Sequence, residues 1–112
     1  MSIDVVPGTL ELVILKTLSR GETLHGFGIL AWLRSVTAGE LAVEEGALYP
    51  ALHRLEQKDL ITGDWGISEK GRRARYYRIT ARGVAELRHE EQKWTRYLWA
   101  WQQIVAAASA AS

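Results

Sequence analysis

The sequence contains no cysteine, and only one methionine, one phenylalanine and two prolines among its 112 residues. Without cysteine the chain can form no disulfide and can offer no thiolate for catalysis or metal binding. It also has no apolar run of the roughly 18 residues that a membrane-spanning helix needs, and residues 1–4 lack the basic start of a secretion signal. We therefore expect a cytoplasmic chain with no membrane partner.

The length predicts one domain with a modest core. A chain of 112 residues falls within the usual size of a single domain, and 47% of its residues are hydrophobic. A chain this short buries a smaller share of its surface than a large one. Further burial by self-association would therefore help it.

Positive charge is concentrated in one short segment, although the net charge of the chain is only +1. Residues 1–67 carry five Lys or Arg against nine Asp or Glu, and residues 83–112 carry three of each sign. The segment 68–82 carries one acidic residue and six basic ones: Lys70, Arg72, Arg73, Arg75, Arg78 and Arg82. Such concentration is typical of a surface that contacts a polyanion. A solvated hairpin without a partner explains the charge equally well.

Hydrophobic periodicity predicts three helices in the first half of the chain. Apolar residues recur at helical spacing over residues 10–18, about 25–36 and about 44–58. Pro50 suits only the first turn of a helix, so we expect the third helix to begin properly near Leu48 or Tyr49.

The second half of the chain predicts a hairpin and one long helix. Two β-prone segments, residues 60–67 and 74–80, flank a polar turn that contains a glycine. Residues 80–83 then lead into the last helix. Its alanine-rich tail, residues 106–112, is expected to fray.

This order of elements predicts a mostly α fold with a small β-hairpin. We expect a winged helix-turn-helix domain over residues 1–82, followed by a C-terminal dimerisation helix and frayed tail over residues 83–112. In a helix-turn-helix the third helix can lie in the major groove of DNA. A flanking hairpin can reach phosphates or the minor groove, and arginine is suited to both.

Three motifs, in this order, resemble the PadR family of bacterial transcriptional regulators. They are LHGFGI at residues 24–29, GALYPALHRLE at residues 46–56, and the segment 65–80 that ends in GRRARYYRIT. The resemblance covers roughly residues 9–83. It implies a winged helix-turn-helix, a dimer through the C-terminal helix, and usually repression that a small molecule relieves. Family members respond to phenolic acids or bind aromatic drugs.

The sequence departs from the family pattern at the start of the third helix. Glu44 and Glu45 stand where many relatives have a serine–proline pair before the glycine. Acidic side chains face DNA poorly, so this departure leaves the base contacts of the first helical turn open.

The charge, the fold and the resemblance together predict double-stranded DNA as a partner. The predicted contacts are Tyr49, His53, Arg54, Lys70, Arg72, Arg73 and Arg75. The Tyr49 hydroxyl would bond a phosphate or a base edge, as the resemblance implies; the alternative is a half-buried tyrosine that packs beside Leu52. Arg54 fits a pairing with a nearby carboxylate equally well.

Apolar residues that repeat every seven positions along the last helix predict a second copy of the chain as partner. The predicted interface residues are Leu87, Trp94, Leu98, Trp101 and Val105. Large aromatic residues at such a seam act first of all as apolar anchors. Trp94, Trp99 and Trp101 also form a candidate site for a planar aromatic effector, as the resemblance to drug-binding relatives implies. Trp99 lies off the stripe.

No pattern in the chain indicates an enzyme or a bound cofactor. The three histidines, His25, His53 and His89, lie far apart, and none has a neighbour at metal-ligand spacing. Gly26-Phe27-Gly28 follows no strand and lacks a third glycine in register, so it is not a phosphate-binding loop.

The sequence therefore predicts a sequence-specific DNA-binding regulator that acts as a homodimeric repressor on a palindromic operator. Two alternatives stay open. One is a sensor of planar aromatic molecules whose DNA binding is secondary. The other is a winged-helix protein-interaction module, and Arg72 and Arg73 in the hairpin turn count against it.

Overall fold

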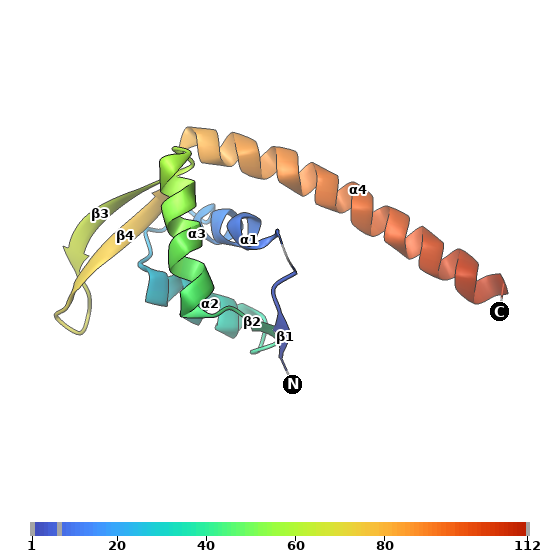
Figure 1. Cartoon of the computed structure of the whole chain (residues 1–112), viewed down its shortest axis with the longest axis horizontal. Helices are drawn as coiled ribbons and strands as arrows, with labels where there is room; N and C mark the ends of the chain where they lie inside the picture. Colours follow the sequence, from blue (N-terminus) through green and yellow to red (C-terminus); the bar gives the residue numbers. More distant parts are fainter. Residues whose placement is uncertain (1, 7, 112) are drawn as a thin grey trace.

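The computed structural model describes residues 2–6 and 8–111, so Met1, Pro7 and Ser112, the last residue of the predicted frayed tail, lie outside the described residues. Figure 1 shows four helices and two small sheets within the described part of the chain. The elements are β1 (Ile3–Asp4), α1 (Leu10–Leu18), α2 (Gly26–Val36), β2 (Leu41–Ala42), α3 (Glu45–Gln57), β3 (Ile61–Ile67), β4 (Arg73–Ile79) and α4 (Ala81–Ala111). This is the mostly α fold with a small β-hairpin that the sequence predicts.

The first three helices pack their apolar faces into one shared core. Their buried residues recur three and four positions apart, as one face of a helix requires. They are Ile14, Leu15, Leu18, Ile29, Leu33, Leu48, Ala51, Leu52 and Leu55. Leu60 before the hairpin, Ile61 and Tyr77 of the hairpin and Leu87 of α4 complete the same cluster. The hairpin and the beginning of α4 therefore belong to the same folding unit as the three helices.

The start of α2 also holds the hairpin in place. His25 is the N-cap of α2, and its Nδ1 accepts a hydrogen bond from the backbone N–H of Gly28 at 2.8 Å. Immediately before it, Leu24 exchanges two backbone hydrogen bonds with Tyr77 of β4, at 3.1 and 2.8 Å. A short extended segment thus joins the open edge of β4 and fixes the hairpin against the helices.

α3 matches the range of about residues 44–58 that periodicity predicts, but not the later start that Pro50 suggested. The helix starts at Glu45, with Glu44 as its N-cap, and Pro50 lies inside it, so the expected start near Leu48 or Tyr49 is wrong. Proline removes the hydrogen bond to the carbonyl four residues earlier and its ring crowds that carbonyl. Here the carbonyl belongs to Gly46, and both residues are exposed, so water can satisfy it.

The hairpin formed by β3 and β4, residues 61–79, is named the wing below. Its strands are antiparallel, with Ile61 opposite Ile79 and Ile67 opposite Arg73. The turn closes where the N–H of Ser68 donates to the carbonyl of Arg72 at 2.8 Å. Gly71 supplies the left-handed backbone that this turn needs, with φ of 74°.

A second sheet was not predicted from the sequence. β1 and β2 form a short parallel pair, with Ile3 opposite Leu41 and Asp4 opposite Ala42. The N–H of Ile3 also donates to the carbonyl of Glu40 at 2.6 Å. This pair ties the N-terminal segment to the loop that leads into α3.

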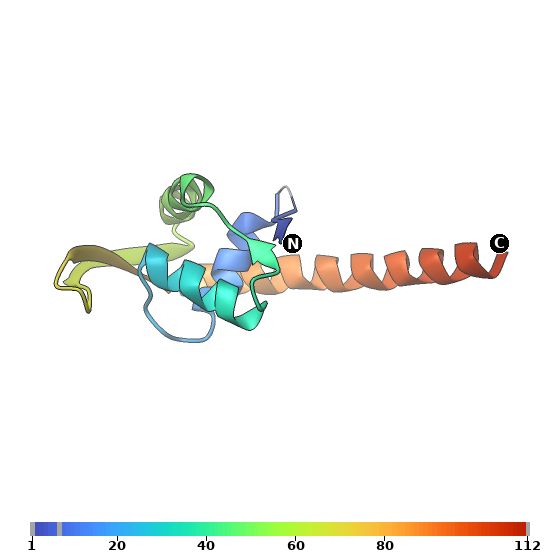
Figure 2. The same cartoon turned by 90° about the horizontal axis from the view of Figure 1, so that it is seen from below.

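α4 is one unbroken helix of 31 residues, about 46 Å long at 1.5 Å per residue. Figure 2 shows most of it projecting alone from the rest of the molecule. The helix continues through Ala111, so residues 106–111 are helical in the structure, and fraying of this tail stays a prediction. Alanine has the highest helix propensity, which favours this continuation. No helix among the described residues combines the length and the apolar character that crossing a membrane requires.

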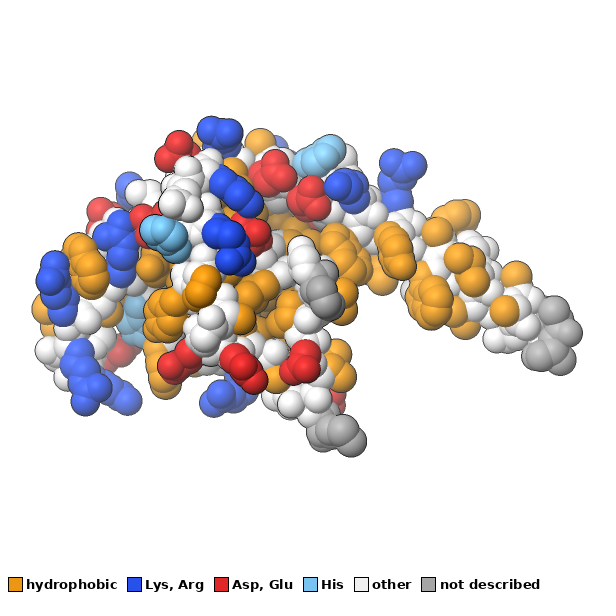
Figure 3. All heavy atoms as spheres, viewed as in Figure 1, with side chains coloured by type: hydrophobic (Ala, Val, Ile, Leu, Met, Phe, Trp, Pro, Cys, Tyr) orange, Lys and Arg blue, Asp and Glu red, His pale blue; other side chains and the backbone are white. Residues whose placement is uncertain are grey.

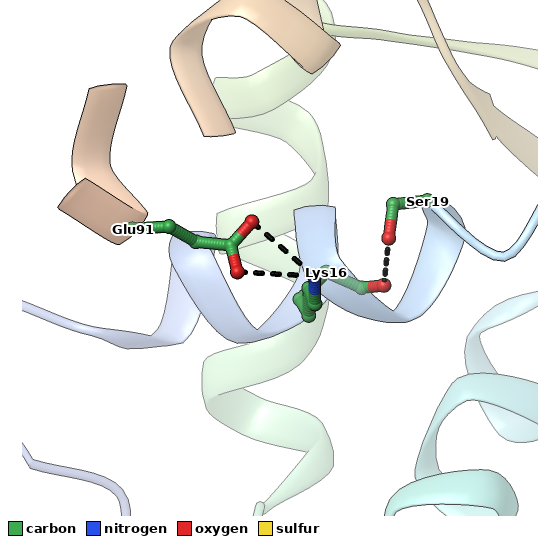
Figure 4. Close-up of polar contacts among 3 residues, drawn as sticks. All are labelled: Lys16, Ser19 and Glu91. Atoms are coloured by element: carbon green, nitrogen blue, oxygen red, sulfur yellow. Dashed lines mark hydrogen bonds and ion pairs between the residues drawn. The ribbon is translucent and has the colours of Figure 1, made fainter. Parts of the chain in front are cut away.

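The beginning of α4 is fixed to the core. Thr80 Oγ1 accepts a hydrogen bond from the N–H of Gly83 at 3.0 Å, and Gly83 lies so close to the backbone of Leu60 that a side chain would collide with it. Further along, the Lys16 Nζ of α1 lies 3.2 and 3.0 Å from the two carboxylate oxygens of Glu91 (Figure 4). α4 therefore leaves the core only after its third turn.

This arrangement corrects one predicted interface residue. Leu87 was expected at the dimer interface because it shares a seven-residue spacing with Trp94 and Trp101. Its side chain is instead only 3% exposed and belongs to the core of its own chain. The first turns of α4 face that core, so the apolar stripe is covered there and uncovered only beyond it.

Candidate nucleic-acid interface

A cleft with a volume of about 500 Å³ lies between the start of α2, α3 and the wing. Five of the seven predicted DNA contacts line it: Tyr49, Lys70, Arg72, Arg73 and Arg75. The first comes from α3 and the others from the wing. The fold therefore brings residues that are more than 20 positions apart in the sequence to one surface.

The cations at the tip of the wing are exposed and carry no counter-charge. Among the described residues, no carboxylate forms an ion pair with Lys70, Arg72 or Arg73. Two of them instead lie near aromatic rings: Lys70 Nζ is 5.8 Å from the centre of the Phe27 ring, and the Arg73 guanidinium is 4.2 Å from that of Trp65. Such cations keep their full charge available for phosphates.

Tyr49 projects from the exposed side of α3 and packs over the start of α2. Its side chain is 48% exposed. A side chain on Gly26 would lie 2.8 Å from a ring carbon of Tyr49 and 2.9 Å from its hydroxyl oxygen, so glycine is required for this close approach. The ring is held by this contact while much of the residue stays accessible. The two interpretations of Tyr49, surface contact and packing residue, thus both describe part of its environment.

Arg75 lies in the cleft but is already paired. Its guanidinium donates to both carboxylate oxygens of Glu56 on α3, from Nε at 3.1 Å and from Nη2 at 2.7 Å. These hydrogen bonds lower the pKa of Glu56 and raise the pKa of Arg75, because each charge stabilises the other. Arg75 is therefore neutralised by a carboxylate, unlike the cations at the wing tip.

His53 and Arg54 lie outside the cleft and in different surroundings. His53 is exposed one turn beyond Tyr49, in a neighbouring hollow that also includes Glu56 and Trp65. Arg54 lies against α1, with its Nε 3.8 Å from a carboxylate oxygen of Glu11. The alternative that paired Arg54 with a carboxylate therefore describes its position in the structure.

Figure 3 shows how charge is divided on this face of the molecule. Basic side chains lie over the wing and along α3 with some acidic ones among them, and a group of acidic side chains lies below the lower end of α3. Glu44 and Glu45 at the start of α3 are both exposed, and the side chain of Glu44 makes no capping hydrogen bond. The two glutamates that depart from the family pattern thus form a negatively charged edge beside the basic surface.

Two aromatic residues of this surface were missed in the sequence. Phe27 at the start of α2 and Trp65 on β3 both line the cleft, and they are 60% and 57% exposed. The alternation of side chains along β3 could have indicated the position of Trp65. It places Trp65 on the same face as Gly63 and Ile67 and opposite Arg75.

The outer half of α4 carries large apolar side chains that the described residues leave largely exposed. The predicted interface residues Leu98, Trp101 and Val105 are 49%, 54% and 43% exposed, and Trp94 is partly buried. Trp94 and Trp101 line a hollow of about 640 Å³, together with Val6, Glu90, Lys93, Tyr97 and Leu98. Trp99 is 64% exposed and lies in a different hollow. The three tryptophans therefore do not share one site within a single chain.

The described residues contain no group of three or more His, Cys, Asp or Glu placed to hold a metal ion. The cleft is lined mainly by cations and aromatic rings, with Glu69 as its one carboxylate. Such a surface can bind an anionic polymer.

The chain is similar in sequence and in fold to known transcriptional regulators. Residues 14–89 match the model of the Transcriptional regulator PadR-like family. Uncharacterized protein X of Lysinibacillus sphaericus is 30% identical over 91 residues, which are 81% of this chain and 83% of that protein. Transcriptional regulator YqjI of Escherichia coli is 38% identical over 55 residues, which are 49% of this chain and 26% of that protein.

Solved structures of transcriptional regulators share the fold of this chain. A PadR-like transcriptional regulator from Bacillus cereus superposes with a TM-score of 0.74 and is 30% identical. The superposition covers 88% of this chain and 92% of the Bacillus cereus chain. The likeness therefore extends over the winged helix and much of α4.

Proposed function

Because this chain belongs to the PadR-like family of transcriptional regulators, we propose that it is a homodimeric repressor that binds a palindromic operator in double-stranded DNA. α3 enters the major groove, and the wing reaches the neighbouring backbone or minor groove. Residues 1–82 form the DNA-binding domain and residues 83–112 the dimerisation segment. The protein works in the cytoplasm, with the DNA that it controls.

One observation carries the proposal: the free cations of the wing and the exposed side of α3 face the same cleft. Lys70, Arg72 and Arg73 have no ion-pair partner among the described residues, and Tyr49 presents its hydroxyl beside them. Phosphate contacts of this kind supply most of the affinity for DNA, while a helix in the major groove supplies sequence specificity. The combination fits duplex DNA better than an uncharged protein partner.

The uncovered stripe on α4 supports the dimer. Leu98, Trp101 and Val105 leave a row of apolar side chains in contact with water. Soluble monomers rarely expose apolar patches larger than a few hundred Å². The same stripe meeting itself across a two-fold axis would bury it without any further sequence. Two copies of α3 would then face one side of the DNA, with half-sites about one helical turn apart.

Selection of bound sequences from a pool of random duplex DNA at low salt tests the proposal. We expect an enriched palindrome, and a selection without any enriched motif would contradict the regulator function. Sedimentation of the protein at micromolar concentration tests the dimer separately. A species with the mass of one chain would remove both the dimer and the palindrome from the proposal.

The repressor role is tested by transcription in vitro from a promoter that overlaps the selected site. We expect the protein to reduce the transcript in proportion to the occupancy of the site. Occupancy that leaves the transcript unchanged or increases it would contradict repression.

A second candidate function is the sensing of a planar aromatic molecule, favoured by the hollow that Trp94 and Trp101 line on α4. Aromatic rings there can stack on a flat ligand. Quenching of tryptophan fluorescence by a panel of planar aromatic compounds tests it. We expect quenching in the parent protein and in Trp99→Phe, since Trp99 lies outside this hollow, and a smaller change in Trp94→Phe. A protein that no compound quenches, or equal quenching in all three proteins, would contradict this candidate.

A further inference from the structure

Four side chains connect α3 to the outer end of the wing in an unbroken series of contacts. Glu56 of α3 holds Arg75 through two hydrogen bonds, at 3.1 and 2.7 Å. Arg75 stands opposite Trp65 in the strand register, and its guanidinium carbon lies 5.6 Å from the centre of the Trp65 ring. The guanidinium carbon of Arg73 lies 4.2 Å from that same ring. The series therefore begins at a carboxylate and ends at a free cation.

Gly63 makes room for this series. A side chain at that position would lie 2.7 Å from Arg75 Nε and 3.1 Å from the ring of Tyr77. A side chain at residue 63 would therefore push Arg75 away from its present path across β3 toward Glu56. The local sequence is thus arranged for the ion pair between the wing and α3.

Core packing does not account for Trp65. Its side chain is 57% exposed and is not part of the hydrophobic core cluster. Its close neighbours are the two guanidinium groups, and cations over the face of an indole ring are attracted to it. Of these two cations, Arg75 is neutralised by Glu56, whereas Arg73 has no carboxylate partner among the described residues.

We propose that Glu56 and Trp65 are positioning residues of the DNA-binding surface. Glu56 holds Arg75, and Arg75 and Trp65 together hold the guanidinium of Arg73 over the indole ring, in the pose in which it meets DNA. This inference rests on the proposed DNA binding through the wing. A long arginine side chain that is fixed beforehand loses less conformational entropy on binding.

Glu56→Gln separates this role from the effect of charge. Removing a carboxylate beside a DNA-binding surface raises affinity on electrostatic grounds alone. The positioning role predicts the opposite sign, because the hold on Arg75 is weakened. We expect the affinity for the selected operator to fall in Glu56→Gln. Unchanged or raised affinity would overturn the inference.

Glu69→Gln is the matched control. Glu69 lies in the turn of the wing, lines the same cleft and forms no ion pair among the described residues. The change in charge is identical, and we expect unchanged or raised affinity. A fall equal to that of Glu56→Gln would show that any lost carboxylate weakens binding, which would also overturn the inference.

A double-mutant cycle tests whether Trp65 acts through Arg73. We expect Trp65→Leu to weaken operator binding by roughly two- to fivefold, the range of an exposed cation–π contact. The same change made together with Arg73→Ala should add nothing. An undiminished effect in the absence of Arg73 would mean that Trp65 contacts DNA itself, contrary to the inference.

Nuclear magnetic resonance of the free protein gives a measurement that does not depend on DNA. The Arg73 Nε–H signal should be shifted upfield by the indole ring, and it should return toward its ordinary position in Trp65→Leu and partly in Glu56→Gln. Operator binding by the parent protein without this shift contradicts the positioning role. A shift in a parent protein that selects no DNA sequence contradicts the proposed function instead.

Discussion

The two ends of α4 lie in opposite environments although they belong to one continuous helix. Near its start, Leu87 is 3% exposed and Glu91 pairs with Lys16 of α1. Near its far end, Trp99 and Ile104 are 64% and 59% exposed. The winged helix, together with the start of α4, therefore completes its own core. In the proposed dimer a second chain covers the outer half of α4, so substitutions in the two regions should have separable effects.

The largest effect is expected where the outer half would meet its partner. Trp94→Ala combined with Trp101→Ala should weaken the dimer by about 4 kcal/mol or more, because each large aromatic anchor typically contributes about 2 kcal/mol. Sedimentation should show single chains at micromolar concentration, with the circular dichroism of the winged helix retained. Dimers that persist in this variant would contradict the assignment of the interface.

A pair of leucines on α4 makes the comparison directly. Leu87→Ala should lower the free energy of unfolding by about 2–5 kcal/mol, the usual cost of a cavity in a core. Leu98→Ala, the same change on an exposed residue, should lower it only at protein concentrations where dimers form. Urea titrations at low and high protein concentration measure both. If both changes lowered the free energy of unfolding equally at low protein concentration, the proposed difference between the two ends of α4 would be contradicted.

Variants of the wing should lose DNA binding and keep the dimer, whereas the tryptophan variant of α4 should lose the dimer and keep the winged helix. Arg72→Ala with Arg73→Ala should flatten the log–log dependence of affinity on salt by about 0.9 for each phosphate contact removed. Affinity should fall for all DNA sequences. Arg78→Ala is the control, because Arg78 lies on the other face of β4 and is also exposed. A salt dependence that matches the parent protein would place the interface elsewhere.

A smaller effect on the same region is expected from Tyr49→Phe. The ring that packs over Gly26 is kept, so stability and dimer mass should not change. Loss of the hydroxyl should weaken operator binding by about 1–2 kcal/mol if it bonds a charged phosphate. Titration of labelled operator DNA measures this. An affinity equal to that of the parent would leave Tyr49 as a packing residue alone.

The smallest effect concerns acid stability within the winged helix. Arg75 lowers the pKa of Glu56, so the folded state binds this proton less readily than the unfolded state. The pair therefore stabilises the fold fully above the unfolded pKa of about 4.3, and this contribution is lost as the pH falls through the lowered folded pKa. The free energies of unfolding of Glu56→Gln and the parent should converge over that acidic range. A difference that does not vary with pH would contradict the linkage.

Local patterns predicted most of the fold, because helical periodicity and strand alternation depend on neighbouring residues. The helices and the hairpin all lie close to their expected positions. The pairing of Ile3 with Leu41 was missed, since two short segments so far apart in the sequence share no local signal. Pro50 led to a wrong prediction for the start of α3. A proline is tolerated inside this helix because the carbonyl four residues earlier belongs to an exposed glycine.

The candidate site was predictable to a smaller extent. Charge clustering marked the wing, and the structure brings Tyr49 to the same cleft. It was not possible to foresee that Arg75 is bound to Glu56, because the pair joins two elements. A seven-residue repeat also does not indicate which part of an apolar stripe packs against the core of the same chain. Leu87 was therefore assigned to the dimer interface although it belongs to that core.

The division of α4 also has a consequence for how such proteins diverge. The residues that would determine the pairing partner lie in the outer half of α4. The residues that form the core of the winged helix lie earlier in the chain, up to Leu87. After a gene duplication, substitutions around Trp101 would alter which chains pair without passing through an unfolded protein. Two copies could thus become independent regulators through changes in a few turns of one helix, with both winged helices unaltered.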